Sequence, residues 1–214
     1  MTNDSAPPML AADDADALEA AVLALEVGGI VGMPTETVYG LGVLPQPRPL
    51  QSLIEAKRRP LDKGIALLID DIAQVDGLVI VPPVARALAE AFWPGALTLV
   101  LPLRPGVSLS AAVTGGRDTL GLRVPDHDIP RALARTLGPL AVSSANLSGE
   151  ADATTAAELV ASVGASLTLV LDDGPVRGGV ASSVIAVDAS GGISVLRAGA
   201  LSTVDVEHVA AGLS

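Results

Sequence analysis

Short runs of aliphatic residues recur along the chain, each of strand length and each far too short to span a membrane. They include residues 30–33, 65–69, 97–101 and 167–171. Half of the residues are hydrophobic, yet the chain has one Phe, one Trp and one Tyr, so Ala, Val, Leu and Ile must fill the core. Aliphatic strands of this kind are typical of sheets covered by helices, which indicates an α/β fold.

Helical patterns separate these runs and carry recognisable start and stop signals. They predict helices over residues 13–27, 50–57, 84–92, 129–137 and 155–163, with a further short helix in the last dozen residues. Further strands are expected at 119–124 and 140–142, and the segments 183–187 and 193–196 should close the sheet as a hairpin. We therefore predict one α/β domain with a mixed sheet over residues 13–201, preceded by a flexible tail over 1–12. Residues 202–214 should form a C-terminal helix or tail of the same domain.

Composition excludes several classes of function. The chain has no cysteine, which rules out disulfides, thiolate catalysis and cysteine-based metal sites, and its two histidines are too few for a zinc site. The N-terminal residues are acidic and polar, unlike a signal peptide, so a cytoplasmic location without membrane association is expected. The formal net charge of −11 argues against a protein that coats nucleic acid.

Four polar segments follow or adjoin aliphatic runs and are rich in hydroxyl, amide, glycine or cationic residues. They are PTETVYG (34–40), KRRPLDKG (57–64), SSANLSG (143–149) and GGVASSV (178–184). Ligands of open α/β sheets bind in the crevice beyond strand ends, so convergence of these loops would make one polar pocket.

The basic segment has two interpretations. Lys57, Arg58, Arg59 and Lys63 fall within seven residues of an otherwise acidic chain, as a phosphate site would require. Cations are also favoured at the C-terminal end of a helix, where they stabilise the helix dipole without any ligand. Similarly, SSANLSG could contact a ligand or could simply be a turn before a helix.

Arg123 is more informative because an unpaired cation near the end of an apolar strand is costly to bury. It should pair with an acid such as Asp126 or meet the carboxylate of a ligand. The neighbouring His127 is expected to be a surface or capping residue rather than a base. No P-loop, GxGxxG fingerprint or GxSxG elbow occurs, so an enzyme of this sequence would work by positioning and charge stabilisation.

Seven segments in this order resemble the YrdC/TsaC family of threonylcarbamoyl-AMP synthases. They are PTETVYGLG, KRRP with its K-x-R motif, WPGALTLVL, GLRVPDH, SSANLSG, SSVI and LRAGAL, and they extend over nearly the whole chain. The resemblance implies a YrdC-like (DHBP synthase-like) fold, a twisted open mixed sheet flanked by helices. The chain stops soon after LRAGAL, which resembles the short, single-domain form of the family.

The family reaction implied by this resemblance joins L-threonine, bicarbonate and ATP into threonylcarbamoyl-AMP and pyrophosphate, with Mg²⁺ accompanying ATP. Partner proteins of the tRNA threonylcarbamoyl-transfer complex would then pass the group to tRNA. The resemblance assigns catalysis to Lys57 and Arg59. It places threonine near Thr35, Tyr39, Arg123, Ser143 and Ser182, and ATP near Lys57, Arg59, Lys63, Ser144, Asn146 and Arg197. It implies no metal site made by protein side chains, because Mg²⁺ is expected to bind through the ATP phosphates.

Other functions remain as alternatives. An RNA- or ribosome-binding paralogue without synthase activity would be expected to lack the K-x-R or S-x-N motifs, and both occur here. The carbamoyl-adenylate domain of hydrogenase-maturation carbamoyltransferases occurs in much longer chains with cysteines. A purely structural module would not explain four polar loops. The acidic net charge also argues against direct tRNA binding, and the SSV at 182–184 replaces the S-T-V of many relatives.

Overall fold

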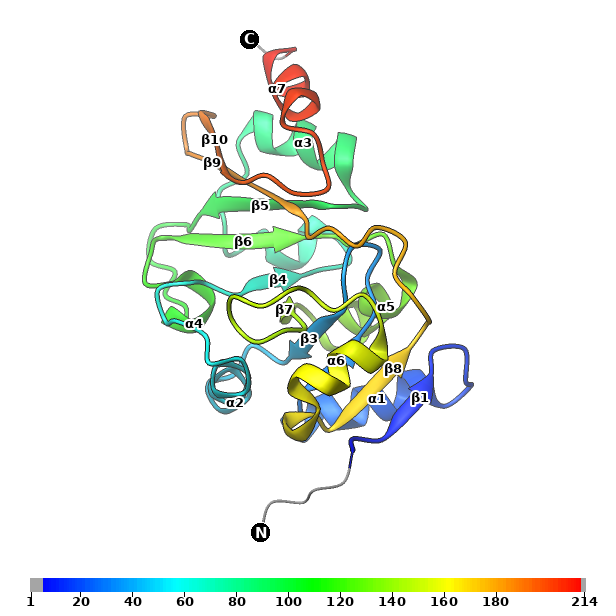
Figure 1. Cartoon of the computed structure of the whole chain (residues 1–214). Coiled ribbons are helices and arrows are strands. Elements are labelled where there is room, and N and C mark those ends of the chain that lie inside the picture. Colours follow the sequence, from blue (N-terminus) through cyan, green and yellow to red (C-terminus); the bar gives the residue numbers. More distant parts are fainter. Residues whose placement is uncertain (1–5, 213–214) are drawn as a thin grey trace.

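Ten strands form one mixed sheet in the computed structural model, which describes residues 6–212 (Figure 1). In chain order the strands are β1 (Met9–Ala11), β2 (Val31–Met33), β3 (Gly40–Val43), β4 (Ala66–Leu68), β5 (Leu97–Pro102), β6 (Thr119–Arg123), β7 (Leu140–Ser144), β8 (Leu169–Asp172), β9 (Ser183–Val187) and β10 (Ile193–Arg197). Their order across the sheet is β1-β8-β2-β3-β7-β4-β6-β5-β9-β10. Parallel and antiparallel pairs both occur, which confirms the predicted mixed α/β sheet.

Helices flank this sheet. They are α1 (Ala17–Glu26), α2 (Pro47–Lys57), α3 (Pro83–Phe92), the short α4 (Ala111–Thr114), α5 (Asp128–Leu137), α6 (Ala156–Val163) and α7 (Thr203–Ala211). Two 3₁₀ turns, η1 (Ile72–Val75) and η2 (Gly164–Ser166), complete the described elements. The predicted helices and the closing β9–β10 hairpin are therefore present, with ends that differ by a few residues. No described helix is long and apolar enough to cross a membrane.

The alternation of side chains in β2 separates two cores. Val31 and Met33 join α1, α5 and β8 in the smaller core. Gly32 faces the opposite side, where a Cβ atom would lie only 2.9 Å from Leu159 of α6. Helix α6 and most of the remaining strands belong to the larger core on that side. The aliphatic composition therefore fills both faces of the sheet, as the sequence predicted.

The first correction concerns the N-terminal tail. Residues 9–11 form strand β1, which pairs in parallel with β8 at one edge of the sheet. The expectation of a flexible tail over 1–12 is therefore wrong for this part, while residues 1–5 lie outside the described residues. The three-residue strand follows two prolines and carries no alternating pattern, so its pairing comes from tertiary contact rather than local sequence.

The second correction concerns the glycines that follow the PTETVY loop. Residues 34–40 were expected to form a loop, yet Gly40 lies together with Gly42 inside β3, a central strand between β2 and β7. A Cβ atom on Gly40 would lie 2.8 Å from Val142, and one on Gly42 would lie 2.3 Å from the terminal methyl of Met33. Glycine is required here because neighbouring side chains leave no room for a Cβ atom, and the sequence alone does not show this role.

Candidate functional site

The K-x-R motif lies where α2 ends. Lys57 is the last residue of the helix, and Arg58 follows in the left-handed conformation with φ 49°. After this change of direction the Arg59 guanidinium reaches the end of β7, where Nη1 donates to the Ser143 hydroxyl at 3.3 Å. Its Nη2 and Nε donate to the carbonyl oxygens of Gly64 (2.7 Å) and Lys63 (3.1 Å). Two of the four polar loops are thus joined by one guanidinium.

Lys57, which was expected to contact the ATP phosphates, is buried with its ammonium against the S-x-N motif. Its side chain is 1% exposed, and its ammonium donates to the carbonyl oxygens of Ser144 and Asn146 and to the amide oxygen of Asn146. An ammonium has three N–H donors, so all of them are used within the protein. Burial, and then the neighbouring Arg59 charge, lower the pKa of Lys57 to about 8. The expected contact between Lys57 and the triphosphate stays a prediction.

The S-x-N motif forms a loop held by its own side chains. Ser144 Oγ donates to the amide oxygen of Asn146 at 2.6 Å, and the amide nitrogen of Asn146 donates to the carbonyl of Glu150 at 2.6 Å. Ser148 N–H donates to the Lys57 carbonyl at 3.1 Å, closing the loop onto α2. The motif therefore gives the loop one defined shape, and its expected contacts with ATP stay a prediction.

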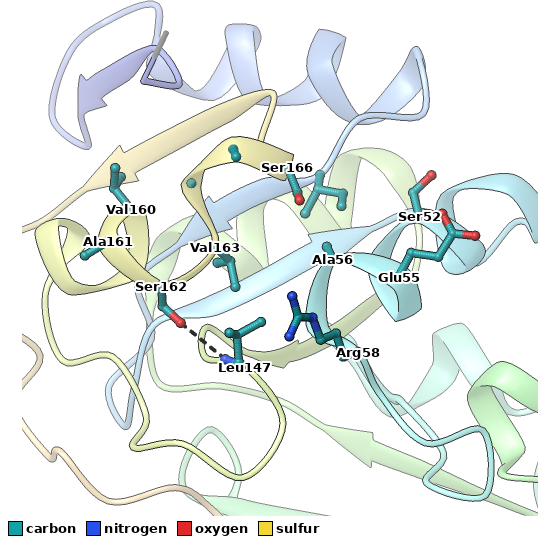
Figure 2. Close-up of a pocket in the computed structure, with 13 residues that line it drawn as sticks. Ser52, Glu55, Ala56, Arg58, Leu147, Val160, Ala161, Ser162, Val163 and Ser166 are labelled. Carbon is teal, nitrogen blue, oxygen red and sulfur yellow. Dashed lines mark hydrogen bonds between the residues drawn. The ribbon is translucent and has the colours of Figure 1, made fainter. Parts of the chain in front are cut away.

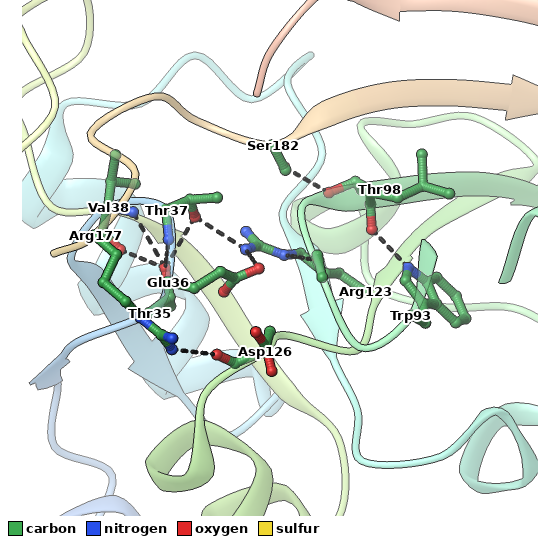
Figure 3. A network of polar contacts seen from close by, with 12 residues as sticks. Thr35, Glu36, Thr37, Val38, Trp93, Thr98, Arg123, Asp126, Arg177 and Ser182 are labelled. Carbon is green, nitrogen blue, oxygen red and sulfur yellow. Dashed lines mark hydrogen bonds and ion pairs between the residues drawn. The ribbon is translucent and has the colours of Figure 1, made fainter. Parts of the chain in front are cut away.

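A second guanidinium–hydroxyl contact lies at the end of β10. Arg197 donates through Nε and Nη2 to the Ser182 carbonyl, at 3.1 and 2.7 Å, and through Nη2 to the Ser182 hydroxyl at 3.3 Å. The same hydroxyl lies 2.8 Å from Thr98 Oγ1 of β5 (Figure 3). Sequence reasoning missed Thr98, although it lies in the WPGALTLVL segment, because the surrounding strand is otherwise apolar.

Three arginines, one after the end of α2 and two at the ends of β6 and β10, act on one another electrostatically. Burial and the nearby Arg197 charge lower the pKa of Arg59. Burial also lowers the pKa of Arg197, with Asp152 opposing that shift and Arg123 adding to it. Arg59, Arg123 and Arg197 therefore form a cationic cluster in a protein of net charge −11, and an anion between them would relieve their mutual repulsion.

Thr35 and Tyr39, which were both expected near threonine, make hydrogen bonds within the protein. Thr35 Oγ donates to the Val38 carbonyl at 2.6 Å and accepts from the N–H groups of Thr37 and Val38, which caps the turn (Figure 3). Tyr39 is fully buried, and its hydroxyl donates to the Gly174 carbonyl at 2.7 Å and accepts from Asp173 N–H at 3.1 Å. Burial raises the pKa of Tyr39 to about 12. Tyr39 therefore lies in the core with its hydroxyl used within the protein, and its expected contact with threonine stays a prediction.

Arg123 meets this loop through a residue that sequence reasoning missed. Its Nη2 lies 2.6 Å from Glu36 Oε1 and 2.9 Å from the Thr37 hydroxyl, while Nε donates to the Gly95 carbonyl (Figure 3). The expected acidic partner Asp126 is not the one used. Glu36 was detectable as the one acid of the 34–40 segment, but its role depends on Arg123, which lies far away in the chain.

These contacts pair Arg59 with Ser143 and Arg197 with Ser182, and the Arg197 charge is influenced by Arg123 and acts on Arg59. Lys63 is exposed on the adjacent turn, and only its main-chain carbonyl contacts Arg59. His127 caps α5, because its Nδ1 accepts from Ile129 N–H at 3.3 Å, which confirms the predicted capping role. Residues 6–212 hold no group of three or more His, Asp or Glu placed to bind a metal ion.

A separate hollow of about 670 Å³ lies between α2 and α6, and contains none of the predicted site residues. Figure 2 shows Arg58 pointing into it from the end of α2, with Leu147, Ser162 and Val163 opposite. Glu55 at its rim accepts from Gln51 at 2.7 Å. One cation in an open groove is a weak ligand site compared with the arginine cluster, so we take the cluster as the candidate site.

Comparisons with known proteins agree with the sequence motifs. The family model Sua5_yciO_yrdC, described as "Telomere recombination", matches residues 23–199. A threonylcarbamoyl-AMP synthase of Bacillus subtilis is 38% identical over 214 residues, covering 96% of this chain and 61% of the relative. A protein of that name from Idiomarina loihiensis is 43% identical over 164 residues, covering 74% of this chain and 87% of the relative. The chain thus spans less than two thirds of the Bacillus relative.

Solved structures show the same fold. Pyrococcus abyssi Sua5 complexed with L-threonine has a TM-score of 0.83 and 35% identity, covering 90% of this chain and 56% of that one. Escherichia coli YciO, at 23% identity and a TM-score of 0.76, covers 90% of this chain and 93% of its own, and supports the fold alone. The match of the family model over most of the sequence, with the shared motifs, shows that the chain belongs to the Sua5/YciO/YrdC family.

Proposed function

We propose that the protein is an L-threonylcarbamoyladenylate synthase, which makes threonylcarbamoyl-AMP and pyrophosphate from L-threonine, bicarbonate and ATP. The observation that carries this proposal is the cluster of Arg59, Arg123 and Arg197 beside the hydroxyls of Ser143 and Ser182. Two of the substrates are anions and the third carries a carboxylate, so a cationic cluster with hydroxyl donors suits all three. The names of the Bacillus and Idiomarina relatives support the same activity.

The threonine half of the site is proposed at Arg123. Two of its nitrogens hold Glu36, Thr37 and Gly95, which fixes the guanidinium plane and leaves Nη1 without a hydrogen-bond partner among residues 6–212. Nη1 can therefore donate to the amino-acid carboxylate. Ser143 and Ser182 are proposed to border the same ligand, whereas Thr35 and Tyr39 act only by shaping the loop and the core beneath it.

The ATP half is proposed between the K-x-R and S-x-N loops and Arg197. Lys57 holds the 144–148 loop through hydrogen bonds from its ammonium. Arg59 and Lys63 are proposed to contact the phosphates from the adjacent turn. Mg²⁺ would be held by phosphate oxygens and water rather than by a cage of carboxylates, and it would neutralise phosphate charge. The donor set fits that arrangement, because the described site residues are mainly cations, hydroxyls and main-chain groups.

The proposed chemistry needs no protein nucleophile. The amine of threonine attacks the carbon of bicarbonate to form a carbamate, and water leaves. A carbamate oxygen then attacks the α-phosphorus of ATP, and the bond to the β-phosphate breaks to release pyrophosphate. Arg59 stabilises the negative charge that moves onto the leaving group, and the fixed guanidinium of Arg123 holds the amino acid in line.

A threonylcarbamoyl-adenylate is an activated intermediate, so another reaction must consume it. We propose that protein partners of the tRNA threonylcarbamoyl-transfer complex receive it, in the cytoplasm. The net charge of −11 disfavours direct tRNA binding by this chain. The same charge, together with retention of both motifs, makes an RNA-binding paralogue without synthase activity the weaker alternative.

The test is release of pyrophosphate by the purified protein with ATP, Mg²⁺, bicarbonate and L-threonine. Release should require both threonine and bicarbonate, and release that depends on neither would refute the synthase proposal. Arg59→Ala should lower turnover at least about a hundredfold while the protein stays folded. Arg58→Gly is the matched control, because it also removes an arginine but keeps the left-handed backbone and should retain activity.

A further inference from the structure

Glu36 has a carboxylate oxygen with no partner. It lies between Thr35 and Thr37 in the loop that joins β2 to β3, and its side chain is 12% exposed. Oε1 pairs with Arg123, while Oε2 is enclosed and makes no hydrogen bond (Figure 3). Across residues 6–212, it is the one enclosed side-chain nitrogen or oxygen atom in this state.

If Glu36 served only to hold Arg123, both of its carboxylate oxygens would be expected to pair with the guanidinium. A guanidinium can present two parallel N–H groups to both oxygens of a carboxylate. Here Arg123 Nε points to the Gly95 carbonyl instead, at 3.0 Å, and Nη2 is shared between Glu36 and Thr37. An enclosed acceptor without a donor destabilises the folded protein, and a donor supplied by a ligand would remove that cost.

The charges around Glu36 complement a zwitterion. Arg59, Arg123 and Arg197 form the cationic cluster, and Glu36 is the carboxylate that directly contacts it through an ion pair. An α-amino acid carries its carboxylate and its ammonium on the same carbon. When the carboxylate meets an arginine of the cluster, a nearby carboxylate with a free oxygen is the partner that the ammonium requires.

We propose that Glu36 Oε2 accepts a hydrogen bond from the α-ammonium of the amino-acid substrate and makes the site selective for α-amino acids over α-hydroxy acids. This inference rests on the proposed function and adds a specificity residue to it. The neutral hydroxyl of an α-hydroxy acid can donate one hydrogen bond to this oxygen, but it leaves the negative charge of the buried carboxylate without an opposite charge, so the site should disfavour that analogue.

The test compares two ligands on two proteins by calorimetric titration. The ligands are L-threonine and its analogue with a hydroxyl in place of the amino group, both measured in the presence of a non-hydrolysable ATP analogue. The wild-type protein should bind threonine at least about tenfold more tightly than the hydroxy analogue. Glu36→Gln keeps the shape and the oxygen that contacts Arg123, and should lose that preference through weaker threonine binding alone.

Glu55→Gln is the matched control, since it also removes one negative charge but lies at the rim of the α2–α6 hollow, and it should keep the preference. If Glu36→Gln weakens both ligands equally, Glu36 only positions Arg123 and the proposal is overturned. Equal binding of both ligands by the wild-type protein overturns it as well, even when the variant cannot be purified. If the wild-type protein binds neither ligand, both the proposed function and this inference about Glu36 are wrong.

Discussion

The ammonium of Lys57 donates hydrogen bonds to the main-chain oxygen and to the side-chain oxygen of Asn146, the latter at 3.1 Å. A third donor goes to the Ser144 carbonyl, and Ser148 N–H returns a hydrogen bond to the Lys57 carbonyl. The first residue of the K-x-R motif therefore holds the S-x-N motif in place. Two motifs that look independent in the sequence form one structural unit, in which Lys57 is a positioning residue.

Lys57→Met should loosen this loop, because three oxygens lose the Lys57 donor and the Asn146 carbonyl is left unpaired among the described residues, at a cost of about 1–3 kcal/mol. Hydrogen exchange at Ala145, Asn146 and Ser148 should become at least about tenfold faster, and affinity for an ATP analogue should fall by a similar factor. Lys63→Met is the control, since Lys63 is exposed and its loss should weaken ATP binding without changing exchange. Unchanged exchange in Lys57→Met would indicate direct phosphate contact instead.

The low pKa of Lys57 predicts a dependence of binding on pH. Burial, followed by the Arg59 charge, lowers this pKa from 10.5 to about 8. The neutral amine has one donor fewer, so affinity for an ATP analogue should fall as pH rises through about 8. Lys57→Met should lack this decrease, and a decrease of equal size in the variant would assign it to another group.

The same pKa has the opposite effect on global stability. Lysine in the unfolded chain keeps its proton up to about 10.5, so the unfolded state binds more protons than the folded state between about pH 8 and 10.5. The contribution of Lys57 to the free energy of unfolding therefore rises with pH across this window. Urea denaturation of the wild-type protein and of Lys57→Met at several pH values measures that difference. An equal pH dependence in both proteins would contradict the lowered pKa.

The fold could be predicted from the sequence where a segment carries its own pattern. Aliphatic runs such as 97–101 and capped helices such as 129–137 match β5 and α5 within a residue. Strand β1 and strand β3 could not be predicted, because three unpatterned residues and a GLGV segment gain their strand structure only by pairing with distant strands.

The site shows the same division. Motifs identified which loops carry polar groups, but they did not show which groups face one another. Glu36 and Thr98 were missed because each is defined by a partner far away in the chain, Arg123 and Ser182 respectively. The hydroxyl partner of Tyr39 could not be predicted for the same reason, since the carbonyl that it contacts belongs to Gly174.

Tyr39→Phe should therefore affect folding more than threonine use. The Gly174 carbonyl loses its donor and the Asp173 N–H loses its acceptor, so the free energy of unfolding should fall by about 1–3 kcal/mol. Threonine affinity should stay within about threefold of the wild type, because the hydroxyl does not face the cationic cluster. Urea denaturation and calorimetric titration measure the two quantities. A large loss of threonine affinity at unchanged stability would return Tyr39 to the pocket.

Gly199→Ala should disturb the site through the backbone. A Cβ atom on Gly199 would lie 2.4 Å from the carbonyl oxygen of Ala181 and 2.4 Å from the carbonyl carbon of Ser182. The 181–182 backbone must move away, which breaks the contacts between Arg197 and Ser182. We expect a loss of about 1–3 kcal/mol in the free energy of unfolding and at least about tenfold weaker threonine binding. Gly77→Ala is the matched control, because nothing lies within 4 Å of its added Cβ. If both variants behave alike, the close approach at Gly199 does not support the site.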